Sequence, residues 1–263
     1  MFTAETISFQ VRGETRPALV HTPRLLCQHP ALLITLTGSR QEALEHRDYR
    51  MVADIFLAAG HRAASFDLPN HGERVDRYGE GLAGMAAAAA AGVDVFADLQ
   101  ATGRALLDRC IELGLARAGG IVLNGVSRGG LAALHVMAAD TRVLACAIHA
   151  PVTHLPALRE FAALPDNPIV RRANAGALTD RLADRPVFIA IGAEDPRVGA
   201  AHAFEFHARL QALAQAYPPE LFVAPGISHG ATYPEEIGFY AAAGFLLRHC
   251  AEQAKGLPHR AGD

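Results

Sequence analysis

The stretch Gly120-Ile-Val-Leu-Asn-Gly125-Val-Ser127-Arg-Gly129-Gly130 decides the fold of this chain. It leads from an apolar segment into Gly-x-Ser-x-Gly, and residues 131–138 continue as a helix-compatible run. An apolar run, a glycine-flanked turn and a helix-forming run indicate a buried strand, a sharp turn and a helix. The flanking glycines allow the backbone to turn tightly and to approach its neighbours closely. The pattern predicts a serine lifted clear of a sheet edge, beside the amino end of a helix.

Two apolar runs downstream of Ser127 each end in a polar loop. Residues 186–191 precede a loop that contains Asp195, and residues 220–224 precede a loop that contains His229. Both runs are short and rich in β-branched and aromatic residues, as buried strands are. The three side chains therefore follow the carboxyl ends of three predicted strands, in the order serine, acid, histidine.

On these motifs the chain resembles the α/β-hydrolases, from about residue 31 to about residue 248. Within that superfamily it is similar to compact esterases related to dienelactone hydrolases and to the catalytic domains of prolyl-oligopeptidase-type enzymes. The resemblance implies one α/β domain over residues 1–263, with a mostly parallel central sheet and helices on both faces. It also implies a catalytic triad of Ser127, His229 and Asp195, with no cofactor and no metal.

The residue types suit the roles that the resemblance implies. A serine needs a neighbouring base to become a nucleophile, and an acid can fix the tautomer of that base. Glu194 competes with Asp195 for the acid, but the family pattern G-x-x-D-x-x-V selects Asp195. Only His229 follows a predicted strand in a glycine-flanked loop; the other downstream histidines lie in a predicted helix or near the end of the chain, namely His202, His207, His249 and His259.

The oxyanion that forms when a serine attacks a carbonyl group needs two hydrogen-bond donors. The resemblance implies the backbone N–H of Arg128 as one donor and the N–H of Ser39 as the other, with Gly38 as the alternative. Relatives often carry His-Gly where this chain has Thr37-Gly38. The side chains of Arg128 and Arg40 could contact an acidic substrate or form surface ion pairs, and both interpretations stay open.

The remaining pattern alternates strands and helices. This alternation predicts a sheet covered on both faces. We expect an amino-terminal hairpin over residues 6–22. Further strands are expected over 31–36, 61–66 and 143–148. Helices are expected over about 49–59, 93–111, 200–216 and 234–252. Residues 79–92 are rich in glycine and alanine, and we expect them to form a mobile loop or a short helix. The stretch 71–72 (His-Gly) predicts a structural turn.

Residues 151–185 show no strand pattern and predict a small cap over the site. Four apolar residues are spaced three apart, so that one short helix could lay an apolar face over the site; they are Leu155, Leu158, Phe161 and Leu164. The alternative is that these side chains pack on the core and leave the site open.

Composition limits the classes of partner. The chain has 263 residues, 51% of them hydrophobic, and a net charge of −3, which fits a globular protein rather than a disordered one. The sequence contains no basic stripe of the kind that would predict nucleic-acid binding. The amino terminus lacks the pattern of a signal peptide, and the uncharged stretch 81–93 is too short to span a bilayer, so we expect a cytoplasmic protein without a membrane partner.

The cysteines and the remaining histidines near the site show no metal-ligand spacing. The four cysteines form no Cys-x-x-Cys pair, and a disulfide between Cys27 and Cys250 stays open. Cys146 lies in an apolar run and is interpreted as a small buried hydrophobe. His149 and His154 fall at and after a strand end, where we interpret them as lining a pocket or as polar residues with satisfied hydrogen bonds.

The sequence thus predicts a serine hydrolase that cleaves a carboxylic ester of a small substrate through an acyl-enzyme. A peptide substrate is less favoured, because relatives that cleave peptides usually carry an amino-terminal propeller and only 30 residues precede Ala31 here. A thioesterase, an acyltransferase and a non-catalytic binding protein of the same fold are the alternatives. The substrate and the oligomeric state stay open.

Overall fold

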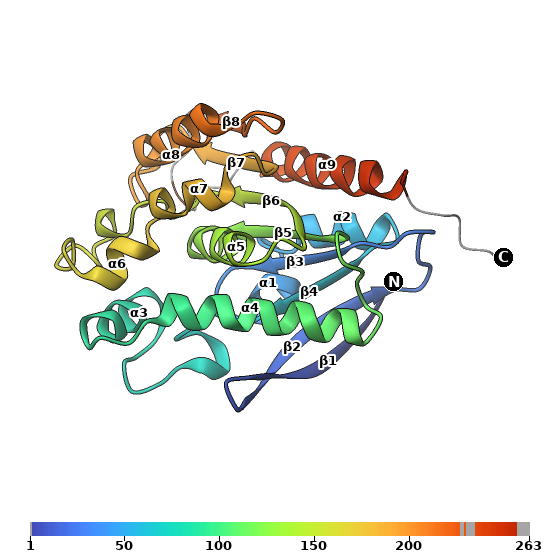
Figure 1. Cartoon of the computed structure of the whole chain (residues 1–263), viewed down its shortest axis with the longest axis horizontal. Coiled ribbons are helices and arrows are strands. Elements are labelled where there is room, and N and C mark those ends of the chain that lie inside the picture. Colours follow the sequence, from blue (N-terminus) through green and yellow to red (C-terminus); the bar gives the residue numbers. More distant parts are fainter. Residues whose placement is uncertain (1, 227–228, 230–234, 257–263) are drawn as a thin grey trace.

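A computed structural model describes residues 2–226, 229 and 235–256 of the chain (Figure 1). In this part of the chain, eight strands form one sheet in the order β1-β2-β4-β3-β5-β6-β7-β8. The strands are β1 (Phe2–Val11), β2 (Glu14–Pro23), β3 (Leu32–Leu36), β4 (Arg62–Phe66), β5 (Ile121–Val126), β6 (Val143–His149), β7 (Val187–Gly192) and β8 (Glu220–Ala224). The strands from β4 to β8 along the sheet pair in parallel, and β1 and β2 are antiparallel. The predicted, mostly parallel α/β-hydrolase sheet is confirmed.

Helices cover both faces of this sheet. One buried cluster joins the sheet to α4, α5 and α8, and a second joins it to α2 and α9 (Figure 1). The described helices are α1 (Arg40–Glu45), α2 (Met51–Ala58), α3 (Gly81–Ala90), α4 (Val95–Glu112), α5 (Arg128–Ala139), α6 (Pro168–Ala173), α7 (Thr179–Leu182), α8 (Ala200–Leu213) and α9 (Glu235–Ala254). The start predicted for the last helix, at Pro234, lies outside the described residues.

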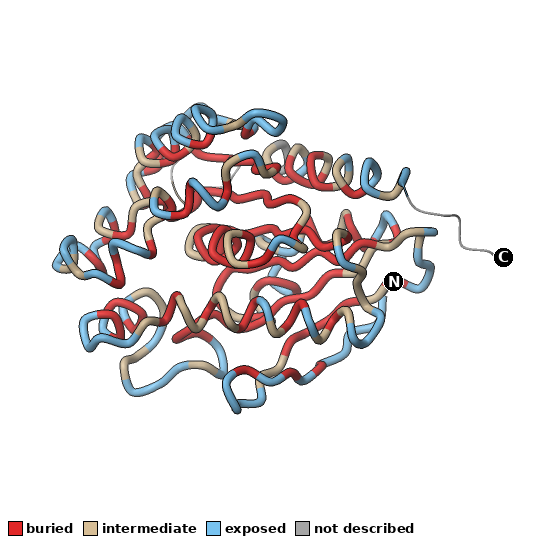
Figure 2. Tube along the Cα trace, viewed as in Figure 1, coloured by how far each residue is buried: buried red, intermediate tan, exposed pale blue. Residues whose placement is uncertain are grey.

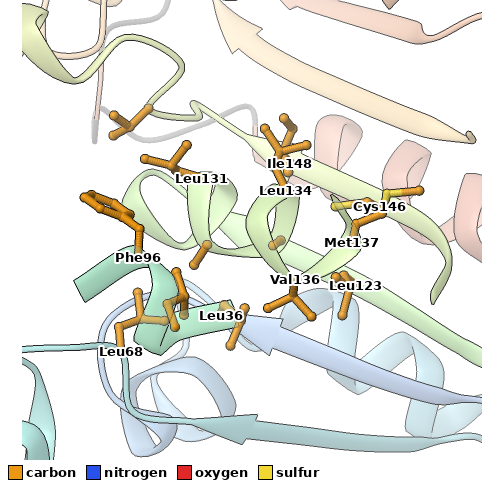
Figure 3. Close-up of a cluster of buried hydrophobic side chains, with 14 of the residues drawn as sticks. Leu36, Leu68, Phe96, Leu123, Leu131, Leu134, Val136, Met137, Cys146 and Ile148 are labelled. Atoms are coloured by element: carbon orange, nitrogen blue, oxygen red, sulfur yellow. The ribbon is translucent and has the colours of Figure 1, made fainter. Parts of the chain in front are cut away.

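The central strands are buried along their whole length (Figure 2). Because helices shield both faces, these strands are mainly apolar rather than alternating. Figure 3 shows how α5 fits into this core: Leu131, Leu134 and Met137 pack toward Ile148 and Cys146 of β6. The packing holds the amino end of α5 rigidly at the carboxyl edge of the sheet, where Ser127 lies.

Of the two alternatives for residues 79–92, the short helix is the one that forms: α3 covers residues 81–90. The short helix α1, which follows β3, was not predicted. The cause of α1 is a cap: the Ser39 side chain accepts a hydrogen bond from the Glu42 N–H at 3.1 Å. Among the described helices none is by itself long and apolar enough to cross a bilayer; α3 and α4 qualify only as a pair bent by 117°.

The segment 151–185 contains short helices but not the single helix expected over Leu155–Leu164. Only a 3₁₀ turn, Leu155–Ala157, forms there, and the extended backbone at Leu158 ends it. Leu155, Leu158 and Phe161 are at most 1% exposed and belong to the main core cluster. These side chains therefore anchor the segment to the core instead of presenting an apolar face to the site.

All four cysteines are free, so the pairing that the sequence left open between Cys27 and Cys250 is not formed. Cys146 is fully buried in the core, and burial raises the pKa of its thiol. This supports its interpretation as a small hydrophobe, because a buried neutral thiol is inert.

Two buried histidines, His135 on α5 and His149 at the end of β6, are held in the neutral form. His135 Nε2 donates to the carbonyl of Ala173 at 2.9 Å, which leaves Nδ1 to accept from the Gln100 side chain. His149 Nε2 donates to the side-chain oxygen of Asn124 at 3.0 Å. Burial lowers the pKa of His135 to about 4 and that of His149 to about 3. Both values lie below the 6.5 of an exposed histidine.

These two pKa values predict that the fold loses stability as the pH falls from about 6.5 toward 4. In this window the unfolded chain binds protons that the folded chain does not. Each of the two histidines therefore lowers the free energy of unfolding by up to about 1.4 kcal/mol for every pH unit of acidification. The free energy of unfolding, measured in urea at several pH values, should show this slope. His149→Gln should reduce the slope, whereas the exposed His46→Gln should not; equal slopes in the two variants would contradict the prediction.

Candidate active site

Ser127 occupies the sharp turn between β5 and α5 in a backbone conformation that side chains rarely adopt. Its φ is 56° and its ψ is −118°. Three hydrogen bonds hold this geometry: the Ser127 N–H donates to the His149 carbonyl at 2.8 Å, and the Ser127 carbonyl accepts from the N–H groups of Gly130 and Val152 at 3.0 and 3.1 Å. Such a strained residue persists only where its surroundings over-determine it. The predicted strand–turn–helix context of Ser127 is confirmed.

The two glycines of Gly-x-Ser-x-Gly are needed for space. A Cβ on Gly129 would lie 1.9 Å from the carbonyl oxygen of Leu36, and a Cβ on Gly125 would lie 2.3 Å from the carbonyl oxygen of Gly129. No real side chain tolerates such distances, so both positions require glycine. The contact of Gly129 with Leu36 also brings the loop after β3 against the first turn of α5.

Three side chains from three loops meet at this edge of the sheet. The Oγ atom of Ser127 lies 3.3 Å from Nε2 of His229, and Nδ1 of His229 lies 2.8 Å from Oδ2 of Asp195. Asp195 is 4% exposed, and its Oδ1 accepts hydrogen bonds from the N–H groups of Arg197 and Val198. Since a carboxylate only accepts, His229 donates from Nδ1 and leaves Nε2 free to take a proton from Ser127.

The alternative acid, Glu194, is exposed and makes no ion pair in the described part of the chain. The other histidines that follow Asp195 are also elsewhere: His202 and His207 lie on α8, and His249 lies on α9. His259 lies outside the described residues. The structure thus brings together the same three side chains that the motifs indicate.

The candidate oxyanion donors are backbone N–H groups on the two segments that Gly129 brings together. Arg128 is the first residue of α5, and Gly38 and Ser39 precede α1 in the loop after β3 that Gly129 contacts. Within the described residues, none of these three N–H groups donates a hydrogen bond, so Ser39 and Gly38 both stay open as the second donor. The Ser39 hydroxyl accepts the capping hydrogen bond of α1, which fixes the side chain at the amino end of that helix. Two free donors of this kind suit a developing negative charge.

A buried ion pair holds the Ser39 loop in place. The side chain of Arg40, 4% exposed, pairs with Asp67 and with Glu73, and the Arg40 N–H donates to Asp67 Oδ1 at 2.7 Å. Arg40 is therefore a structural residue, neither a substrate contact nor a surface pair. Arg128 is half-buried, and its guanidinium lies 3.5 Å from the carboxylate of Glu42.

His71 is part of a structural turn, as predicted, and lies close to the site. Its ring Nδ1 donates to the carbonyl of Pro69 at 2.8 Å, while Nε2 is buried without a hydrogen-bond partner among the described residues. Burial lowers the pKa of His71, and the positive charge of Arg128 lowers it further. Its ring faces Gly38, where an added Cβ would lie 2.9 Å from the imidazole.

Sequence reasoning missed one contact that supports Asp195. The guanidinium of Arg197 binds both carboxylate oxygens of Glu160 at 2.8 and 3.0 Å. Both contacts come from one guanidinium nitrogen, Nη2, and this ion pair joins the loop of Asp195 to the segment 151–185. The two residues are 37 positions apart, and no local pattern in the sequence links them. In the part of the chain that the structure describes, no three histidine, cysteine, aspartate or glutamate side chains cluster in a way that could hold a metal ion.

Comparisons with known proteins agree with this geometry. The family model described as "Alpha/beta hydrolase family" matches residues 37–259. No curated protein matches the chain significantly in sequence. Among solved structures, a cold-adapted esterase from an Arctic intertidal metagenomic library has 21% sequence identity and a TM-score of 0.71, with 94% of each chain covered.

Two further structures are similar in fold. An esterase from Pyrococcus furiosus has 20% identity and a TM-score of 0.66, covering 94% of this chain and 93% of its own. A putative dipeptidyl aminopeptidase IV from Bacteroides ovatus has 14% identity and a TM-score of 0.74, covering 96% of this chain but 36% of its own. At such identities the likeness concerns the fold alone, but the family model covers most of the chain. The chain therefore belongs to the alpha/beta hydrolase family.

Proposed function

We propose that the protein is a serine esterase that hydrolyses a carboxylic ester of a small substrate. One observation carries the proposal: Ser127, His229 and Asp195 form a continuous hydrogen-bonded chain, with candidate oxyanion donors on the two segments that Gly129 brings together. A nucleophile, its base, the group that orients the base and oxyanion donors are the parts that acyl transfer needs. The esterases among the structural neighbours support the same choice of reaction.

In the proposed mechanism, Oγ of Ser127 attacks the ester carbonyl while its proton passes to Nε2 of His229. Asp195 stabilises the imidazolium that forms, and the N–H groups of Arg128 and Ser39 donate to the oxyanion. His229 then gives the proton to the departing alcohol, which leaves an acyl-enzyme. Water then attacks the acyl-enzyme while His229 takes a proton from it as the base. His229 returns the proton to Oγ of Ser127, and the carboxylic acid is released.

Hydrolysis of p-nitrophenyl acetate tests this proposal. Turnover above the spontaneous rate is expected, and its absence would favour a binding protein of the same fold. Adding an alcohol as acceptor and analysing the products separates a hydrolase from an acyltransferase. A matched thioester and an aminoacyl anilide extend the test to the thioesterase and peptidase alternatives.

A small apolar hollow lies beside the turn of Ser127. It has a volume of about 10 Å³ and borders Arg128; Leu82, Met85, Phe96 and Leu131 are among its lining residues. A space of this size holds roughly one water-sized group. It therefore supports a preference for short acyl chains.

We expect acyl chains of roughly two to six carbons to be hydrolysed faster than chains of twelve, because a methylene contributes about 0.8 kcal/mol only where it is buried. A series of p-nitrophenyl esters, compared by kcat/KM, measures this. Met85→Ala should enlarge the hollow and move the optimum to longer chains. Leu113→Ala, an exposed leucine just past the end of α4, is the matched control and should leave the optimum unchanged. A wild-type optimum at twelve carbons would refute the prediction.

A further inference from the structure

A cavity lies between the segment 153–177 and α8. Its volume is about 500 Å³. His154 from one wall and His202 from the other stack on each other, with ring centroids 4.6 Å apart. The cavity is separate from the small apolar hollow, and nothing in the mechanism above uses it.

Two short backbone connections link the walls of this cavity to the proposed active site. The N–H of Val152 donates to the carbonyl of Ser127 at 3.1 Å, and Thr153, the next residue, lines the cavity. The Cα atom of Thr153 is therefore within roughly 8 Å of the Ser127 carbonyl oxygen, by standard backbone dimensions. On the other wall, α8 begins directly after the loop that holds Asp195.

The cavity is lined by hydrogen-bond donors more than by acceptors. Arg171 and Arg209 contribute guanidinium groups, and Glu205 contributes the one carboxylate among the described lining residues. Glu205 lies 2.6 Å from Arg209 and neutralises it in part. Arg171 makes no ion pair with another described residue, so the lining retains an excess positive charge.

Two polar side chains in the lining have hydrogen-bond donors that are free to bind a ligand. The side-chain oxygen of Asn174 already accepts from the Leu155 N–H at 2.7 Å, which leaves its NH₂ group to donate. The hydroxyl of Thr153 is buried without a hydrogen-bond partner among the described residues, and Thr153 is 5% exposed. Buried polar groups are normally satisfied, so an unpaired hydroxyl in a cavity wall indicates a missing partner.

We propose that this cavity is a subsite for an oxyanion, a carboxylate or a phosphate, carried by the small substrate of the enzyme. Two guanidinium groups, an amide NH₂ and a hydroxyl form hydrogen bonds to such a group, and charge-assisted bonds of this kind are the strong ones. As a part of the substrate site the cavity rests on the proposed esterase function. Its affinity for an anion can be measured without any turnover.

Calorimetric titration with adipate and with butyl phosphate tests the subsite directly, with adipamide as the uncharged control. We expect at least one of the two anions to bind and adipamide not to bind. The anion that binds more tightly shows whether the subsite recognises a carboxylate or a phosphate. Arg171→Gln and Arg209→Gln should each weaken binding about tenfold or more. Arg172→Gln is the matched control, because Arg172 pairs with Asp94 and does not line the cavity.

Two further variants sharpen the result. Glu205→Gln should tighten anion binding, because it removes the carboxylate of the cavity. Thr153→Val should weaken binding while the melting temperature stays unchanged or rises, since its hydroxyl has no partner to lose within the described structure. A structural role for Thr153 would instead lower the melting temperature.

The same anions should inhibit hydrolysis of p-nitrophenyl acetate competitively. If the protein does not hydrolyse that ester, the proposed function fails while calorimetry still tests the subsite. If hydrolysis occurs but neither anion binds at about 10 mM, or if Arg171→Gln and Arg172→Gln bind alike, the subsite is overturned and the esterase proposal stands.

Discussion

Ser127→Ala is expected to lower kcat/KM for p-nitrophenyl acetate by a factor on the order of 10³ or more. The hydroxyl of Ser127 is the only group in the hydrogen-bonded chain that can form an acyl-enzyme, and alanine retains the turn without it. A fluorophosphonate probe should label the wild-type protein at Ser127 and leave the variant unlabelled. Labelling of the variant at an unchanged rate would rule out Ser127 as the nucleophile.

Ser39→Ala provides the matched serine control at the same edge of the sheet. Its hydroxyl caps α1 through Glu42, whereas the proposed oxyanion donor is its backbone N–H, which alanine keeps. We expect a loss of stability of about 1 kcal/mol with activity within a few fold of wild type. A loss of activity as large as that of Ser127→Ala would instead place the Ser39 hydroxyl in the chemistry.

Asp195→Asn is expected to leave the protein folded and to lower kcat by a factor on the order of 10³ or more. The Oδ1 atom of Asp195 accepts from two backbone N–H groups, so the oxygen of an asparagine would remain there. Its NH₂ group would then face Nδ1 of His229 and donate to it. His229 would carry its proton on Nε2 and could no longer accept one from Ser127.

The neighbouring carboxylate supplies the control for this experiment. Glu194 is exposed and lies on the same loop, so Glu194→Gln removes one negative charge without touching His229. We expect kcat to stay within about twofold of wild type, because exposed charges are screened. Circular dichroism of both variants establishes that they are folded. A large effect of Glu194→Gln with a small effect of Asp195→Asn would reverse the assignment of the acid.

Much of the site was predictable because its parts are local in sequence. Ser127 lies between two glycines, after an apolar strand and before a helix, and each of these features acts within a few residues. Asp195 and His229 each follow a short apolar strand, and parallel strands bring their carboxyl ends to one edge of the sheet. The choice of Asp195 over Glu194 came from the family pattern, and the contact with His229 at 2.8 Å agrees with it.

Predictions about residues 151–185 were less successful, because spacing alone cannot say what a face packs against. Leu155, Leu158 and Phe161 recur every third residue, which is compatible with a helix over the site. The extended backbone at Leu158 ends the turn that forms there, and the three side chains are buried in the core. Their burial depends on the positions of α4, α5 and the sheet, and a local pattern contains no information on those positions.

The sequence by itself determined the alternation of the main strands and helices and the turn at Ser127, since these follow from local periodicity and glycine. It also identified the three side chains that meet there, through chain order and, for Asp195, the family pattern. Only the tertiary structure decided what surrounds them. It pairs Arg40 with Asp67, binds Arg197 to Glu160, and encloses a cavity between Thr153 and α8. The physical reason is that ion pairs and cavities form between segments far apart in the chain, and only the packing of the whole fold brings those segments together.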